Sequence, residues 1–168
     1  RDGMIQIYAI KNWEGIYKWH TMTDWTHKNQ LITELPEDCV GFVYIVTNTE
    51  SGKRYIGKKL AKFAKTKYRI VKLKNGTKKR KKIKEKIDSD WLTYYGSSND
   101  LTADIEALGK RCFTREILYY CYSKAECSYV EAREQFRHKV LESDEWYNGQ
   151  IRVRVHQSQH VINESNQD

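Results

Sequence analysis

The sequence predicts a small α/β domain of the α+β kind, in which an antiparallel three-stranded sheet is flanked by helices and carries a basic β-hairpin insert. Three observations favour this class: short β-rich runs bounded by turn residues, two segments with helical periodicity that begin at capping residues, and a block of lysines in mid-chain. At 168 residues the chain can bury a core without disulfide or metal crosslinks.

The first part of the chain, residues 1–38, is expected to form an aromatic-rich N-terminal arm. It carries five aromatic residues: Tyr8, Trp13, Tyr17, Trp19 and Trp25. Aromatic side chains at this density favour packing over disorder. We expect residues 39–150 to form the main domain. Residues 151–168 are expected to form a C-terminal strand and tail, because residues 151–155 alternate apolar and basic side chains.

The main domain opens with two β-rich runs, residues 42–46 and 53–57, which a turn-forming cluster at residues 48–52 separates. They predict an antiparallel hairpin. A basic insert follows at about residues 58–88. Between Lys58 and Lys86 the sequence has 15 of its 30 basic residues and one acid, so this stretch carries a charge of +14 and the rest of the chain −6.

The insert contains its own hairpin signal. Asn75-Gly76 is a favoured type I′ turn pair, and it separates two strand-like runs, residues 69–74 and 77–83. A two-stranded ribbon has the dimensions of a DNA groove, and its lysines favour a polyanionic partner. The alternative, a solvated charged loop, stays open.

Two helices and a third strand complete the predicted domain. The first helix follows a turn at residues 95–99 and ends at Gly109. Residues 113–122 are rich in strand formers and supply the third strand. The second helix begins at Ser123 in a capping box and runs to about Leu141.

A helical repeat places two sets of residues on opposite sides of the second helix. One side is mainly apolar and is expected to be buried: Tyr129, Ala132, Phe136 and Val140. The other side is polar: Glu131, Glu134, Gln135 and His138.

The first hairpin carries a recognisable motif pair. Residues 44–48, Tyr-Ile-Val-Thr-Asn, and residues 54–57, Arg-Tyr-Ile-Gly, resemble the paired motif of the GIY-YIG nucleases, and later features up to residue 148 follow that family's order. The basic stretch before Tyr-Tyr-Gly-Ser-Ser looks like a phage-type, homing-endonuclease-like branch. Gly41 and Gly57 correspond to the motif glycines, although Gly41 precedes Tyr44 by three residues instead of two. The literal Gly-Ile-Tyr at residues 15–17 has no Tyr-Ile-Gly at hairpin distance.

The resemblance implies a residue for each chemical need of phosphodiester hydrolysis. Tyr44 is the candidate general base, and Tyr55 would support the nucleophile or the phosphate. Glu131 would hold one divalent cation, Mg²⁺ or Mn²⁺, and Glu134 is the alternative ligand. Asn148 would close the site, or else form a simple Asn-Gly turn.

The arginine expected from the resemblance is missing from its usual place. It normally lies on a helix about two turns after Tyr-Ile-Gly, where this chain has Lys65. Arg69 is the candidate catalytic replacement if that helix is shifted, and Arg80 lies further along the ribbon. Lysine cannot reproduce the planar, bidentate contact of arginine with a phosphate.

Together these features predict a metal-dependent endonuclease that hydrolyses double-stranded DNA, in a soluble cytoplasmic protein without a membrane span. Ten basic residues are expected to contact DNA: Lys58, Lys59, Lys65, Lys72, Lys74, Lys78, Lys79, Arg80, Lys81 and Lys82. A non-catalytic nucleic-acid-binding module, and a nuclease for branched DNA or RNA, are the alternatives. A monomer and a homodimer are both open. The four cysteines form no zinc-binding pattern and are expected to be reduced thiols.

Overall fold

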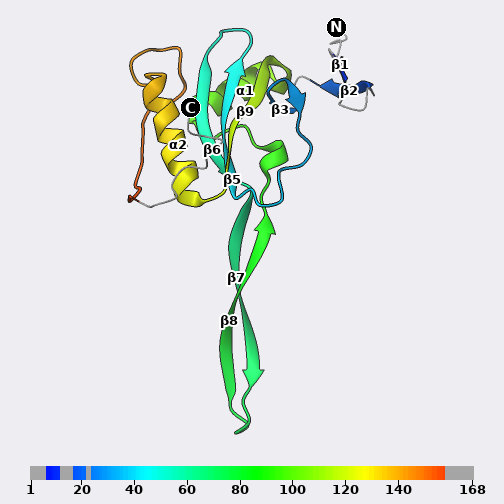
Figure 1. Cartoon of the computed structure of the whole chain (residues 1–168), viewed down its shortest axis with the longest axis vertical. Coiled ribbons are helices and arrows are strands. Elements are labelled where there is room, and N and C mark those ends of the chain that lie inside the picture. Colours follow the sequence, from blue (N-terminus) through cyan, green and yellow to red (C-terminus); the bar gives the residue numbers. More distant parts are fainter. Residues whose placement is uncertain (1–6, 12–16, 22–23, 158–168) are drawn as a thin grey trace.

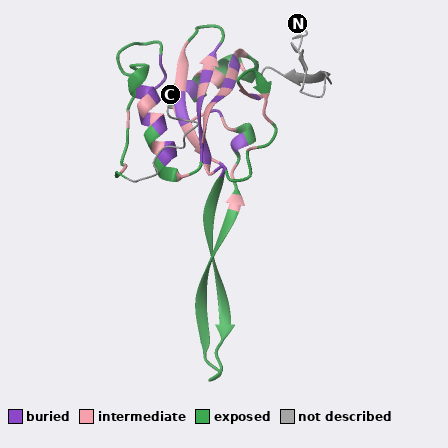
Figure 2. Cartoon of the chain, in the orientation of Figure 1, coloured by how far each residue is buried: buried purple, intermediate pink, exposed green. Residues whose placement is uncertain are grey.

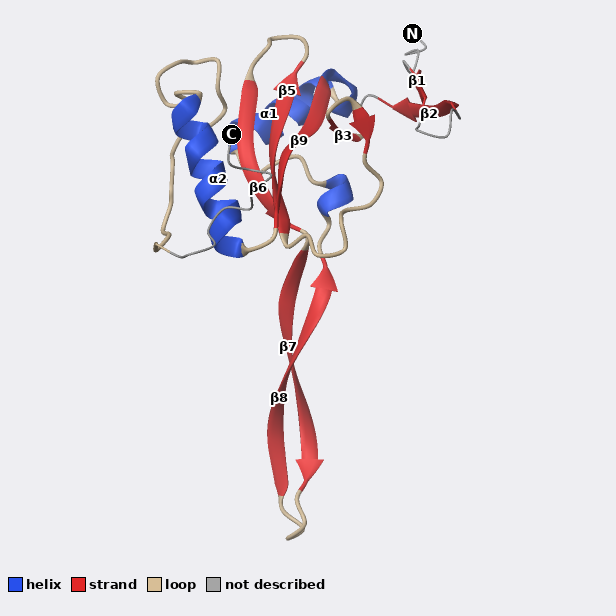
Figure 3. Cartoon of the chain, in the orientation of Figure 1, coloured by secondary structure: helices blue, strands red, loops and turns tan. Residues whose placement is uncertain are grey.

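The body of the protein is a five-stranded sheet with a helix on each side, and a long two-stranded ribbon projects from one end (Figures 1 and 3). The computed structural model describes residues 7–11, 17–21 and 24–157. Trp13 and the literal Gly15-Ile16 therefore lie outside the described residues. In the described N-terminal part, β1 (Ile7–Lys11) and β2 (Tyr17–Thr21) pair as an antiparallel hairpin.

The sheet has the strand order β4-β3-β9-β5-β6. Its strands are β3 (Trp25–His27), β4 (Gln30–Leu31), β5 (Gly41–Asn48), β6 (Arg54–Leu60) and β9 (Phe113–Cys121). Strands β3 and β9 run parallel, and the other neighbours are antiparallel. The three strands predicted from the sequence are β9, β5 and β6, which confirms the predicted antiparallel unit.

The sheet is larger than the three strands predicted, because residues 25–31 add β3 and β4 at one edge. These strands are too short to show a periodic pattern. Burial of Trp25 holds them: the indole packs edge-on against Phe42 and Tyr44 and donates a hydrogen bond to the carbonyl oxygen of Trp91 at 2.8 Å. Part of the segment assigned to the N-terminal arm thus contributes to the main core.

Both predicted helices form, and the predicted residues cap them. Helix α1 (Asn99–Leu108) begins at Ser98 and ends at Gly109, whose φ of 86° suits glycine. Helix α2 (Lys124–Arg137) begins at Ser123, whose hydroxyl accepts a hydrogen bond from the Glu126 amide at 3.0 Å. Two short 3₁₀ helices, η1 (Trp91–Thr93) and η2 (Lys110–Cys112), flank α1. No helix within the described ranges is long and apolar enough to span a membrane.

Helix α2 is rotated relative to the prediction: Ala132 and Val140 are buried, but the other two residues of the predicted apolar side are not. Phe136, expected inside, is 63% exposed, and Tyr129 is also exposed. The inward side carries Glu134 and Gln135 instead, beside the buried residues Cys127 and Val130. Gln135 holds this orientation, because its side-chain amide donates a hydrogen bond to the Ile56 carbonyl oxygen on β6 at 3.1 Å. Part of the side predicted to be polar therefore faces the sheet, whereas His138 on that side is exposed.

The basic insert forms the ribbon of β7 (Lys62–Lys72) and β8 (Lys78–Asp88), which pair over their full length. Figure 2 shows it exposed along nearly all of that length. The turn lies where Asn75-Gly76 predicted it, but it is not type I′. Gly76 has a φ of 83° whereas Asn75 does not have a positive φ, so the turn is a three-residue loop closed by Gly76.

Residues 151–157 form no strand, although residues 151–155 were expected to do so. The nearest open sheet edge is β6, and its backbone is already occupied. The Asn148 side chain accepts a hydrogen bond from the Ile56 amide at 3.0 Å and donates one to the Ile56 carbonyl oxygen at 2.7 Å. At Ile56, therefore, no unpaired backbone group is left for a further strand to join.

The two motif glycines leave room for close contacts. A Cβ atom on Gly57 would lie 2.7 Å from the Tyr44 hydroxyl and 2.7 Å from the Tyr55 ring, so both rings pack over this position. A Cβ atom on Gly41 would lie 2.7 Å from the Lys59 carbonyl oxygen. The glycine of the Tyr-Ile-Gly motif is therefore required for the close packing of the Tyr44 and Tyr55 rings.

We predict that Gly57→Ala destabilises the protein by about 1 to 3 kcal/mol, because the added methyl group overpacks the space under the two tyrosine rings. Gly149→Ala is the matched control, since a Cβ atom there meets nothing within 4 Å. Urea unfolding measures both variants. An equal loss of stability in the two would contradict the packing explanation.

Candidate active site

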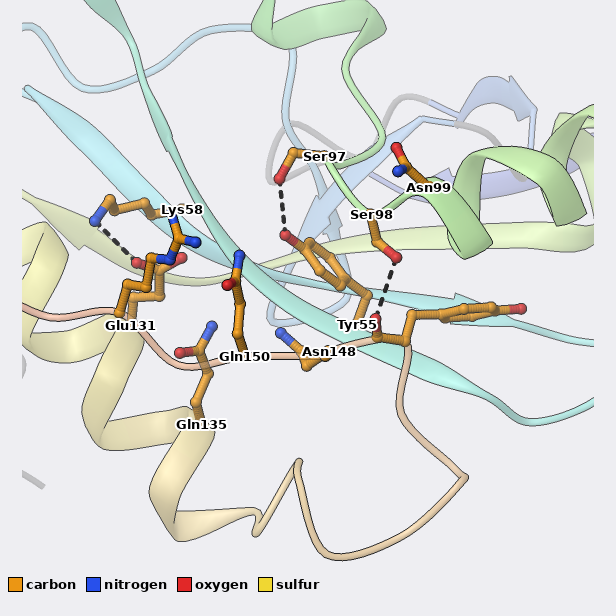
Figure 4. Close-up of a pocket in the computed structure, with 12 residues that line it drawn as sticks. Tyr55, Lys58, Ser97, Ser98, Asn99, Glu131, Gln135, Asn148 and Gln150 are labelled. Atoms are coloured by element: carbon orange, nitrogen blue, oxygen red, sulfur yellow. Dashed lines mark hydrogen bonds and ion pairs between the residues drawn. The ribbon is translucent and has the colours of Figure 1, made fainter.

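A cleft of about 530 Å³ lies at the edge strand β6 (Figure 4). Tyr55 and Lys58 line it from β6 itself, and alternation along a strand places them on opposite faces of the sheet. Residues on the α1 side complete one wall: Ser97, Ser98 and Asn99. Residues on the α2 side complete the other: Glu131 and Gln135. The chain after α2 crosses the sheet edge between these walls with Tyr147, Asn148, Gly149, Gln150 and Arg152.

Hydrogen bonds along β6 fix the segment that crosses the sheet edge. The Arg54 amide donates to the Glu145 carbonyl oxygen at 2.9 Å, and the Tyr147 amide donates to the Arg54 carbonyl oxygen at 2.7 Å. One residue later the Asn148 side chain makes the two bonds to Ile56. Its amide group therefore takes the place of a neighbouring strand, and Asn148 does more than form the simple turn considered from the sequence.

The two motif tyrosines differ in their access to the cleft. Tyr55 lines it, and its hydroxyl lies 3.1 Å from the Ser97 hydroxyl. Tyr44 does not line the cleft: it is 0% exposed and packs against Trp25, Tyr55 and Tyr94. The two ring centroids are 6.2 Å apart, so the tyrosines touch as a pair while only one of them reaches the cleft.

Burial makes both phenols poor acids. Desolvation raises the pKa of Tyr44 well above its ordinary value, and the neighbouring Tyr55 and Tyr94 raise it further. Desolvation also raises the pKa of Tyr55, which the hydrogen bond from Ser97 partly offsets. Since the ordinary phenol pKa is about 10, both side chains are neutral near pH 7.

The structure separates the two glutamates that the sequence left as alternatives. Glu131 lines the cleft, is 14% exposed, and lies 2.9 Å from the Lys58 ammonium group. Glu134 is 3% exposed and faces away from the lining residues toward Arg133, whose Nε atom lies 3.1 Å from its carboxylate. The carboxylate that is available to a ligand in the cleft is therefore Glu131.

The cleft suits a cation that needs few protein ligands. Within residues 24–157, no three His, Cys, Asp or Glu side chains gather as a metal site. Mg²⁺ is commonly held by one or two carboxylates, with water and substrate phosphates completing its shell. One carboxylate beside an open, polar cleft fits that requirement.

The basic residues expected at the site are widely separated. The segment after Gly57 is strand and not helix, so Lys65 and Arg69 lie on β7 and Arg80 on β8, all exposed and outside the cleft lining. Of the lysines next to Gly57, Lys58 pairs with Glu131. Lys59 pairs with Asp90 at 2.6 Å and lies over the Tyr94 ring at 3.7 Å.

Eight lining residues were not found from the sequence as site residues: Ser97, Ser98, Asn99, Gln135, Tyr147, Gly149, Gln150 and Arg152. Ser97 was seen only as part of a helix-capping turn, and Gln135 was assigned to the polar side of α2. Arg152 belongs to the segment expected to be a strand. The sequence feature that could have pointed to Arg152 is its position four residues after the motif asparagine, Asn148.

A family model described as "Putative endonuclease segE, GIY-YIG domain" matches residues 25–151. This region begins at β3 and includes the whole five-stranded sheet, both α-helices, and all but one of the residues that line the cleft. No significant match to the chain was found among curated proteins or among solved structures. With most of its length matched and the tyrosine pair, helix glutamate and asparagine in order, the chain belongs to the GIY-YIG nuclease family.

Proposed function

We propose that the protein is an endonuclease that hydrolyses phosphodiester bonds of double-stranded DNA in the cleft at β6, with Glu131 as the ligand of one Mg²⁺ or Mn²⁺ ion. The observation that carries this proposal is the convergence of Tyr55, Glu131 and Asn148 from three separate segments onto one polar cleft. Membership of the GIY-YIG family supports nuclease chemistry at that place.

Glu131 and Lys58 form the charged part of the proposed site. Their ion pair of 2.9 Å neutralises the carboxylate, so a divalent cation has to compete with the Lys58 ammonium group for it. When bound, the cation would supply Lewis-acid stabilisation of the phosphate and lower the pKa of a coordinated water. Released from Glu131, Lys58 is free to approach a DNA phosphate.

Tyr55 is the phenol that we assign to the attacking water, and Tyr44 is assigned a supporting role. Tyr44 was the candidate general base from the sequence, but its burial and its raised pKa favour a neutral side chain that fixes the Tyr55 ring. A neutral Tyr55 can accept a hydrogen bond from water and orient it without carrying charge. Asn148 is assigned to positioning, because it holds β6 against the segment that crosses the sheet edge.

The ribbon is the part of the protein that we assign to DNA binding. Eleven paired residues at about 3.4 Å each give it a length of about 37 Å, close to one turn of B-DNA. The register puts basic residues on both faces. One face carries Lys62, Lys72, Lys78, Arg80, Lys82, Lys84 and Lys86, and the other carries Lys65, Lys67, Arg69, Lys79 and Lys81. Such a ribbon can contact phosphates whichever face it presents.

A non-catalytic DNA-binding module is the second candidate, and one observation favours it. Helix α1, the first helix after the Tyr-Ile-Gly motif, contains neither arginine nor lysine in its ten residues. A scaffold that lacks a phosphate-polarising residue would still bind DNA through the ribbon. Incubation of the wild-type protein with Mg²⁺ or Mn²⁺ and duplex, branched or single-stranded DNA, or RNA, separates the candidates. If no substrate is cut, the enzyme proposal is rejected.

We predict that Glu131→Gln lowers the rate of plasmid nicking by about 1,000-fold or more, because several kcal/mol of charge stabilisation depend on the carboxylate. Glu134→Gln is the matched control on the same helix and should nick plasmid at a rate within about tenfold of the wild type, since it does not line the cleft. Circular dichroism checks that both variants fold, and calorimetry measures Mn²⁺ binding. Normal Mn²⁺ binding by Glu131→Gln would reject Glu131 as the ligand.

We predict that Tyr55→Phe lowers the cleavage rate at saturating DNA by about 100-fold, because its hydroxyl lines the cleft. Tyr44→Phe should lower that rate by less than about tenfold, since the ring that supports Tyr55 is kept. Single-turnover kinetics measure both variants. The reverse order of the two effects would return the role of general base to Tyr44.

We predict that changing Lys78, Lys79, Arg80, Lys81 and Lys82 to glutamine weakens DNA binding for every sequence. The slope of log K against log salt should fall by about 2 to 4, because each lost phosphate contact removes about 0.9 from it. Fluorescence anisotropy at several salt concentrations measures this. Glutamine at Lys110, Arg111 and Lys124, exposed residues outside ribbon and cleft, is the control. An unchanged slope in the ribbon variant would mean that the ribbon is a solvated hairpin only.

A further inference from the structure

The cleft contains two cationic side chains, and one of them is already neutralised. Lys58 lies 2.9 Å from the Glu131 carboxylate and donates a hydrogen bond to the Ser128 hydroxyl at 3.0 Å. The other cation is Arg152. Within the part of the chain that the structure describes, Arg152 has no ion pair or hydrogen bond of its side chain, and it is exposed. Its guanidinium group is therefore available to a ligand in the cleft.

The backbone before Arg152 is fixed to β6 and to the α1 side of the cleft. Asn148 is bonded to Ile56 on β6, and the Ser98 hydroxyl donates to the Tyr147 carbonyl oxygen at 3.1 Å. Gly149 and Gln150, which follow, also line the cleft. Arg152 thus lies only four residues from a rigid anchor, at the rim of the cleft that holds Tyr55 and Glu131.

Phosphodiester cleavage requires a group that stabilises charge on the two non-bridging oxygens. The planar guanidinium group can donate two parallel hydrogen bonds to them, which an ammonium group cannot do. The two arginines considered from the sequence, Arg69 and Arg80, lie on the ribbon, α1 has none, and Arg152 is the one arginine among the residues that line the cleft. The family model's match ends one residue before Arg152, so the match assigns it no role.

We propose that Arg152 contacts the phosphate to be cleaved and stabilises its charge in the transition state, in place of an arginine on α1, which has none. The proposal rests on the proposed nuclease function for its catalytic part. Binding of a phosphodiester by Arg152 is a separate property that can be measured without any cleavage. The segment after Asn148 then has a function of its own, as the carrier of the phosphate-contacting side chain.

Arg154 provides the matched control. It is exposed on the same segment, two residues further on, and it does not line the cleft. We compare Arg152→Gln, Arg152→Lys and Arg154→Gln in single-turnover cleavage of plasmid with Mg²⁺. Arg152→Gln should cleave about 100-fold more slowly than the wild type at saturating DNA, as expected for the loss of one transition-state donor. Arg152→Lys should recover part of the rate, and Arg154→Gln should cleave within about threefold of the wild type.

A second measurement does not depend on cleavage. The dinucleotide dTpdT is added to the wild-type protein while the Nε–H signals of Arg152 and Arg154 are followed by NMR. Each signal is assigned by its loss in the variant Arg152→Lys or Arg154→Lys. The Arg152 signal should shift in a saturable way, and the Arg154 signal should not.

Each outcome decides something. Equal cleavage rates for Arg152→Gln and Arg154→Gln in a protein that cuts DNA would overturn the role of Arg152 and leave the nuclease function intact. A wild-type protein that cuts nothing, with a saturable shift of Arg152 alone, would reject the nuclease function and support the phosphodiester contact. Absence of that shift, or an equal shift of Arg154, would overturn the contact itself.

Discussion

The pairing of the Asn148 side chain with the backbone of Ile56 is the interaction on which the site depends. Strand β6 is at the edge of the sheet, and an unpaired backbone group there costs about 1 to 3 kcal/mol when it is buried. Asn148 satisfies both the amide and the carbonyl group of Ile56, and Gln135 on α2 bonds the same carbonyl oxygen. A single strand residue thereby connects α2 and the segment that crosses the sheet edge, so that Glu131 and Tyr55 keep a fixed separation.

Much of the central fold could be predicted from the sequence, because its signals are local. The hairpin of β5 and β6, strand β9, and the caps of both helices follow from alternation, turn residues and hydroxyl side chains. Strands β3 and β4 could not be predicted, since they are held by the distant burial of Trp25. The rotation of α2 was also missed. Its inward side is held by a hydrogen bond from Gln135 to β6, and the pattern of hydrophobic residues in the sequence gives no information about such a bond.

The candidate site shows the same division between local and distant causes. The family resemblance pointed to the two tyrosines, the glutamates and the asparagine as candidates. It could not tell which tyrosine reaches the cleft, because Tyr44 is covered by Trp25, a residue far outside the motif. Nor could it separate Glu131 from Glu134, three residues apart on α2. That distinction depends on which carboxylate faces Lys58 and which faces Arg133.

The ribbon leaves and rejoins the body at one point, where the Ser89 amide donates a hydrogen bond to the Ala61 carbonyl oxygen at 2.9 Å. An insertion with its two ends this close imposes little on the surrounding fold, because the same closure serves a long hairpin or a tight turn. A change in its length can therefore be accommodated without rebuilding the sheet, so the reach of the ribbon and the geometry of the cleft at β6 are structurally independent.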